Sequence, residues 1–377
     1  MNVTVDEFGK LVRESKEDEA LKAFDVLWTH NPDYHVILDE VENSALSSFS
    51  HRFSSIHVPK EHEYLQRFIG ETSEEIQKAF LKRYLEYLIW SPKYQLNVSE
   101  GLTSGIGPDE DLGESFISAA DNGRAMPALY YINEVAGRDL DAALNSILRM
   151  GCIDVSQAIG HYFSCTESVI KLGKRAGLPS AKNHILSAVL YMMQSEPLRL
   201  SLPERPESKL SEILSSLIKK SGFVEYHYMI LANGLIRERQ NLGETYFLQA
   251  LAGLEKIILQ LNEGMSKSFI DKTIDDNVST DSSISSIQES IWKGDRSTAF
   301  SGMRSYLAEN GVTNELKNGI LYCYTRIRGH PHDPHYVTAP ESIFELIDFL
   351  DGDEVELAVA HTINFAVNRI LRNGLLP

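Results

Sequence analysis

The helical character of this chain is plainest in residues 73–90, which read SEEIQKAFLKRYLEYLIW. Bulky apolar side chains recur here at steps of three and four residues, which places them on one face of an α-helix. They are Ile76, Phe80, Tyr84, Tyr87 and Leu88. Thr72 and Glu75 have the spacing of a capping box, and Pro92 is expected to end the helix.

The same period runs through most of the chain, and proline or glycine separates one stretch from the next. Further helices are predicted at 3–29, 34–48, 112–121, 126–137, 139–150, 154–176, 180–194, 208–220, 223–240, 243–262, 295–308, 312–327, 340–350 and 353–372. Alternating patterns typical of strands joined by tight turns are absent. We therefore predict an all-α fold, an irregular assembly of roughly 14 to 18 helices without a substantial sheet.

One segment differs in composition from the rest of the chain. Residues 264–286 are rich in Ser, Asp and Lys and contain few bulky apolar side chains. This composition predicts an exposed linker or mobile loop between an N-terminal helical body, 1–263, and C-terminal helices, 287–377. Packing of the C-terminal helices back on the body would make the whole chain a single domain.

Composition narrows the classes of partner. The chain has 377 residues, 43% of them hydrophobic, and a formal net charge of −17, which repels phosphate backbones and anionic lipids. Nucleic acid and membranes are therefore not expected as partners, and no apolar run is long enough to span a bilayer. Cys152, Cys165 and Cys323 lie in apolar segments at wide spacing, which predicts buried, reduced thiols and a cytoplasmic location.

Histidines in short motifs are the strongest functional signal. His161 follows Asp154 by seven residues, so both side chains would share one face of the helix predicted over 154–176. His361 follows Glu354 at the same spacing on the last predicted helix. Either carboxylate could orient the imidazole of a metal ligand. Taken alone, each histidine is more often a core residue bonded to a neighbouring carbonyl.

Two further histidines lie where a helix is expected to begin. His35 comes shortly after Pro32, in the first turn of the helix predicted over 34–48. His335 belongs to the stretch GHPHDPHYVTAPE, residues 329–341, in which an extended approach leads to a helix beginning at Pro340. Such a density of histidine in a proline-restrained loop favours a metal site, although these loops also hydrogen-bond helix ends.

Other common site signatures are missing from the sequence. The chain contains no Glu-x-x-His, His-Glu-x-x-His or Cys-x-x-Cys, which argues against ferritin-like di-iron sites, zinc peptidases and zinc modules. It also lacks Gly-x-Gly-x-x-Gly and the Walker loop, so neither a nucleotide nor a flavin is expected.

Three of the histidine segments resemble a known family, the questin oxidase-like proteins. The segment YHVILDEVENSAL, residues 34–46, is similar to their Asn-His-Leu-Pro-x-Ala-Leu element, and AIGHYFSCTESV, residues 158–169, resembles their Phe-His-Gly-Leu-Ile-Arg helix. HYVTAPESI, residues 335–343, is similar to their His-x-Val-Thr-x-x-x-Ala motif. HTINF, residues 361–365, lies where the family tends to carry His-x-x-Lys.

The resemblance implies an all-helical oxygenase that uses dioxygen on a hydrophobic, aromatic small molecule. It implies non-heme iron(II) on His35, His161, His335 and His361, with Asp154 and Glu354 orienting the rings. Tyr34 replaces the family's Asn, and Gly160 stands where an aromatic residue is common. Asn364 stands at the lysine position, which argues against a carbamylated-lysine ligand.

The alternative is a non-catalytic helical protein that binds or scaffolds a basic partner through its acidic surface. In that case the histidines would only satisfy helix ends. The separation of the rings distinguishes the two hypotheses, because ligands of one metal ion must converge to within about 5 Å, given metal–nitrogen bonds of about 2.0–2.1 Å.

Overall fold

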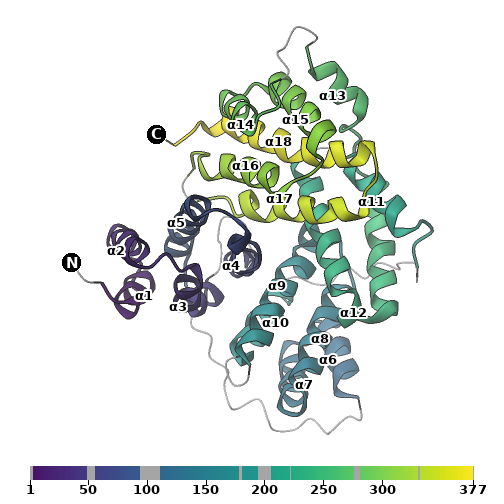
Figure 1. The fold of residues 1–377 in the computed structure, drawn as a ribbon. Coiled ribbons are helices and arrows are strands. Elements are labelled where there is room, and N and C mark those ends of the chain that lie inside the picture. Colours follow the sequence, from purple (N-terminus) through teal and green to yellow (C-terminus); the bar gives the residue numbers. More distant parts are fainter. Residues whose placement is uncertain are drawn as a thin grey trace.

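The computed structural model describes residues 3–48, 56–93, 111–177, 181–193, 205–220, 222–275, 281–329 and 332–376, and Figure 1 shows its helices. The N-terminal helices are α1 (Val5–Arg13), α2 (Glu17–His30), α3 (Tyr34–Leu46), α4 (His57–Phe68) and α5 (Glu74–Trp90). The central helices are α6 (Leu112–Asp121), α7 (Ala125–Arg138), α8 (Leu140–Gly151), α9 (His161–Ala176), α10 (Ala181–Met192), α11 (Leu210–Ile218) and α12 (Phe223–Ile258). The C-terminal helices are α13 (Lys267–Thr273), α14 (Ile284–Lys293), α15 (Arg296–Asn310), α16 (Asn314–Thr325), α17 (His335–Leu346) and α18 (Asp353–Asn373).

The predicted all-α class is confirmed. Within the described ranges no strand forms, and β-type pairing of the backbone is limited to three isolated bridges. Short 3₁₀ turns occur at Ile69–Glu71, Gln157–Gly160 and Ile347–Phe349. No helix of the described part combines the length and apolarity needed to cross a bilayer.

Most predicted helices form at about their predicted bounds, but the one predicted over 3–29 forms as two, α1 and α2, and α4, α13 and α14 were not predicted. Prolines were expected to separate the helices, whereas Pro59 occupies the third position of α4. Proline is tolerated there because the first-turn amides have no partner within the helix. The helix carries mostly polar residues, so hydrophobic periodicity gives no sign of it.

Two helices begin elsewhere than predicted, and both differences move a histidine. The helix expected over 154–176 starts only at His161, because Ala158, Ile159 and Gly160 all have positive φ, at 48°, 58° and 79°. The helix expected from Pro340 starts already at His335, and Pro340 lies inside it. Each histidine is thus the first residue of its helix.

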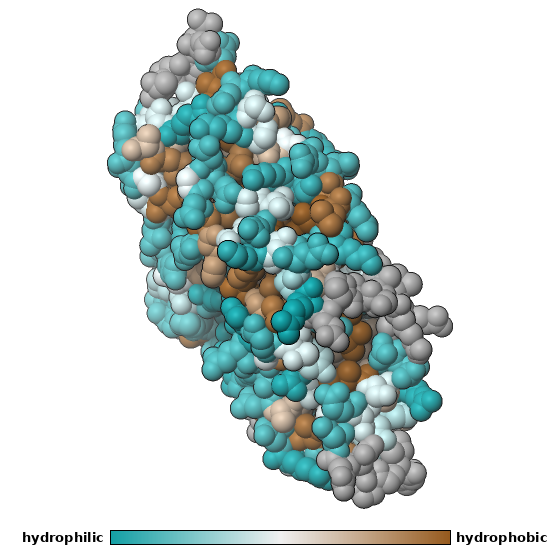
Figure 2. Space-filling model, turned by 90° about the vertical axis from the view of Figure 1, so that its right-hand side faces the viewer, coloured by the Kyte–Doolittle hydropathy of each residue, from teal (hydrophilic) through white to brown (hydrophobic). Residues whose placement is uncertain are grey.

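The segment predicted as a linker contains a helix, α13, and the first residues of α14. Residues 276–280 lie outside the described part of the chain. The C-terminal helices pack against earlier ones: α17 contacts α4 and α12, and α16 contacts α5. In Figure 1, α4 lies near α3, α5 and α17, which it contacts. Polar residues are spread over the face shown in Figure 2, with apolar residues between them.

Candidate metal centre

The site is built on α4, a polar helix that is buried almost all around. Five of its charged or imidazole side chains are at most 1% exposed: His57, Lys60, Glu61, His62 and Glu63. Burying such groups costs free energy unless each is paired or neutralised, so proteins rarely bury them without partners. The helix contacts α9, α3, α5 and α17, which enclose it.

Four histidines from four helices converge beside the start of α4. They are His57 on α4, His161 on α9, His227 on α12 and His335 on α17, and all four are buried. Ring centroids lie 4.6 Å apart for His57 and His161, 5.1 Å for His57 and His335, and 4.6 Å for His227 and His335. The ring of His227 also lies 4.8 Å from that of His161.

The ring nitrogens themselves come close together. Nε2 of His57 and Nε2 of His161 are 2.9 Å apart. One nitrogen from each of His57, His161 and His335 can be chosen so that all three lie within 4.8 Å of one another. Two nitrogens bound at about 2.1 Å to one ion, at right angles, lie about 3.0 Å apart. The separation between His57 and His161 therefore fits two neighbouring ligands of one metal ion.

Acceptors on the far side of two rings set their tautomers. Nδ1 of His161 donates to the carbonyl of Ala158, in the left-handed turn that precedes α9. Nδ1 of His335 lies 2.7 Å from Oδ1 of Asp333, which also accepts the His335 backbone amide at 3.0 Å. With Nδ1 protonated in both rings, each Nε2 presents its lone pair, as metal-bound histidines require.

Burial disfavours the charged form of two imidazoles of the centre, His57 and His161. Burial lowers the pKa of His57 and His161 well below 6.5, and neighbouring positive groups, Lys60 among them, add to the effect. Burial alone would raise the pKa of Asp333, but His335 and Arg369 hold that pKa well below its ordinary range. Neutral imidazoles backed by one carboxylate suit a borderline divalent ion such as iron(II) or zinc.

Of the predicted ligands, the structure brings His161 and His335 together. His35 is exposed and stacks on Tyr34, with ring centroids 4.1 Å apart. His361 is buried elsewhere, and its Nε2 lies 2.6 Å from the carbonyl of Ile218 on α11. Neither belongs to the group of histidines that can share one ion.

The two predicted orienting carboxylates contact other partners. Asp154 precedes the left-handed turn, so it does not share a helix with His161, and its Oδ1 accepts from the amide and hydroxyl of Ser156. Glu354 does share α18 with His361, but its carboxylate accepts from the Ser215 hydroxyl. The carboxylate that orients a ring of the centre is Asp333 instead.

Sequence reasoning missed His57 and His227. A signal for His57 was present, because His57-Val-Pro59 reproduces the histidine and proline of the Asn-His-Leu-Pro element better than the segment at His35 does. His227 lies between two tyrosines inside the long helix α12, and no motif distinguishes it from a core residue.

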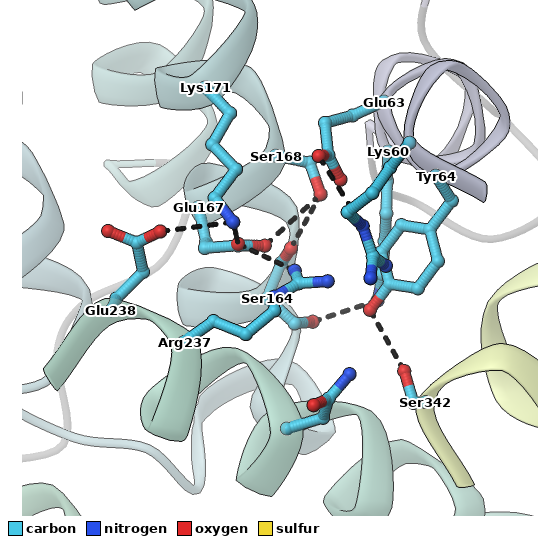
Figure 3. A network of polar contacts seen from close by, with 12 residues as sticks. Lys60, Glu63, Tyr64, Ser164, Glu167, Ser168, Lys171, Arg237, Glu238 and Ser342 are labelled. Carbon is cyan, nitrogen blue, oxygen red and sulfur yellow. Dashed lines mark hydrogen bonds and ion pairs between the residues drawn. The ribbon is translucent and has the colours of Figure 1, made fainter. Parts of the chain in front are cut away.

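Beyond the histidines, α4 and α9 share a layered polar seam, shown in part in Figure 3. One turn past His57 and His161, the Lys60 amine donates to the Ser164 hydroxyl at 2.9 Å. Glu63 and Glu167 follow one turn further, and both are 1% exposed. The two helices therefore run parallel, in register, with one polar pair per turn.

The pKa values of the two glutamates of the seam are shifted in opposite directions. Burial raises the pKa of Glu63, and the charge of Glu167 raises it further. Burial opposes ionisation of Glu167 too, but Arg237 and Lys171 hold its pKa at about 2. The Arg237 guanidinium donates to Glu167 at 2.6 Å, and the Lys171 amine lies 3.0 Å from the same oxygen.

Comparison with known proteins adds no assignment. No family model, no curated protein and no solved structure matches this chain.

Proposed function

We propose that His57, His161, His227 and His335 hold one divalent transition-metal ion, and that the protein is an oxygenase. The observation that carries the metal site is the 2.9 Å contact between Nε2 of His57 and Nε2 of His161, because one nitrogen from each of these rings and from His335 can lie within 4.8 Å of one another. His227 is included because its ring centroid lies 4.8 Å from that of His161 and 4.6 Å from that of His335. The choice of iron(II) and of a hydrophobic, aromatic substrate rests on the family resemblance.

The residues of the proposed metal site would have different roles. The four imidazoles would bind the ion, while Asp333 and the Ala158 carbonyl keep His335 and His161 in the binding tautomer. The buried position of the rings would exclude bulk water. Bound iron(II) would supply redox chemistry with dioxygen and open positions for ligands.

The protein's three cysteines are buried and form no disulfide. Cysteines without disulfides are usual in a reducing compartment. We therefore propose the cytoplasm as the location, which agrees with iron in its reduced state.

Metal analysis of variants tests the proposal most sharply. Tag-free protein is produced anaerobically in iron-supplemented medium and its iron measured by elemental analysis. We expect about one iron per chain, lost in His57→Ala and in His161→Ala. The matched control is His35→Ala, since His35 and His57 are rival positions for the same motif.

Thermal unfolding of each variant separates loss of metal from loss of fold. Folded His57→Ala protein that keeps its iron would refute the site as drawn here. Iron lost in His35→Ala but kept in His57→Ala would favour the assignment made from the sequence alone. Wild-type protein that takes up neither iron nor Co²⁺ on reconstitution would overturn the metal centre altogether.

A further inference from the structure

Lys60 lies in the layer of the seam next to the histidines, and its surroundings are unusual for a lysine. The side chain is 1% exposed. Burial lowers the pKa of this amine, and even an uncharged amine has two N–H donors. Within the described part of the chain the only acceptor that the amine reaches is the Ser164 hydroxyl, at 2.9 Å. Among the described residues no carboxylate lies within ion-pair distance of its Nζ.

The nearest carboxylates are occupied by other cations. Glu167 is held by Arg237 at 2.6 Å and by Lys171 at 3.0 Å. Oε1 of Glu63, the other carboxyl that acts on Lys60, lies 3.7 Å from Nε of Arg67. Figure 3 shows these groups beside the Lys60 side chain. Lys60 therefore keeps donors for a partner that the protein itself does not supply.

A divalent metal ion would add positive charge beside the Lys60 amine. The four imidazoles bring no negative charge, and Asp333, a carboxylate that contacts His335, is also an ion-pair partner of Arg369 at 3.6 Å. An anion between the ion and the amine would balance the charge of the ion and accept the remaining N–H donors of Lys60.

We propose that the metal-loaded histidine centre binds an anionic group of its ligand, a carboxylate or a phenolate, between the ion and the Lys60 amine. Ser164 accepts one N–H of this amine and so directs the others. The inference rests on the metal centre proposed above and specifies the substrate class further: an ionised aromatic acid or phenol, not a neutral hydrocarbon.

Azide binding to Co²⁺-loaded protein tests the anion site without any substrate. Azide is a small anion, and its binding changes the visible absorption of Co²⁺. We expect Lys60→Met to keep one Co²⁺ per chain and to bind azide at least about tenfold more weakly than wild type. Lys171→Met, which removes a half-buried lysine further along the seam, should stay within about twofold of wild type.

The outcomes separate the two proposals. Unchanged azide affinity in folded, Co²⁺-loaded Lys60→Met overturns the anion site and leaves the metal centre standing. Wild-type protein that takes up no Co²⁺ overturns both. If Lys60→Met does not fold, Ser164→Ala decides: weaker azide binding supports the site, and unchanged binding overturns it.

Discussion

Removing the Arg237 side chain should destabilise the protein more than any surface change on α12. Glu167 is 1% exposed, and its pKa is held at about 2 instead of 4.5. This difference is worth about 3 kcal/mol of folding stability at pH 7, at about 1.4 kcal/mol per pKa unit. Arg237→Met leaves Glu167 buried without its closest cation, and breaking such a pair typically costs about 3–5 kcal/mol.

Urea unfolding followed by circular dichroism at pH 7 measures this cost. The matched control is Arg239→Met, two residues along α12, where Arg239 and Glu244 form an ion pair with side chains 54% and 60% exposed. Exposed pairs contribute about 0–1 kcal/mol, so this variant should unfold almost like wild type. The double variant Glu167→Gln/Arg237→Met should recover part of the loss, because it leaves no unpaired charge.

The dependence on pH follows from the same pKa. Because the folded pKa of Glu167 lies below the unfolded value, its contribution is present above about pH 4.5 and disappears as the pH falls toward 2. The gap between wild type and Arg237→Met should therefore narrow in that range. A cost below about 1 kcal/mol at pH 7, or strictly additive effects in the double variant, would refute the reasoning.

Two further predictions concern buried histidine and backbone strain. Burial lowers the pKa of His62 to about 4, so between about pH 6.5 and 4 the unfolded chain binds one more proton, and stability falls as the pH falls through this range. His62→Gln should reduce the slope of unfolding free energy against pH by about 1.4 kcal/mol per pH unit, and a slope equal to that of wild type in urea unfolding would contradict this. Gly160 has φ of 79°, and a Cβ there would lie 3.3 Å from Leu231. Gly160→Ala should cost about 1–2 kcal/mol and weaken Co²⁺ binding by turning His161, and unchanged Co²⁺ affinity would argue against a role for the turn.

Hydrophobic periodicity was enough to predict the all-α class and most helices, because most helices here pair one apolar face with one polar face. It failed at α4, whose polar side chains are buried by helices from distant parts of the chain. Burial of that kind depends on tertiary packing, so a local pattern cannot report it. The omission of α4 removed His57 from consideration.

Local backbone geometry explains the remaining differences at the site. His161 was assigned to the interior of a helix with Asp154, yet three left-handed residues separate them. Two of these, Ala158 and Ile159, are not glycine, and sequence patterns do not predict positive φ at such residues. His335 was placed in an extended loop, but the Asp333 carboxylate accepts its backbone amide at 3.0 Å and starts the helix there.

The left-handed turn before α9 is best explained by the histidine that follows it. Positive φ at Ala158 and Ile159 costs on the order of 1–3 kcal/mol at each residue, and 39% of the Ile159 side chain is exposed, so its packing does not offset the strain. What the turn does provide is the Ala158 carbonyl, positioned to accept Nδ1–H of His161 and to direct Nε2 at His57. A helix continued back to Asp154 would need that carbonyl for its own hydrogen bonds. The strained turn thus fixes the tautomer and the ring direction of His161, a candidate metal ligand. Backbone strain of this kind is typically found at functional sites.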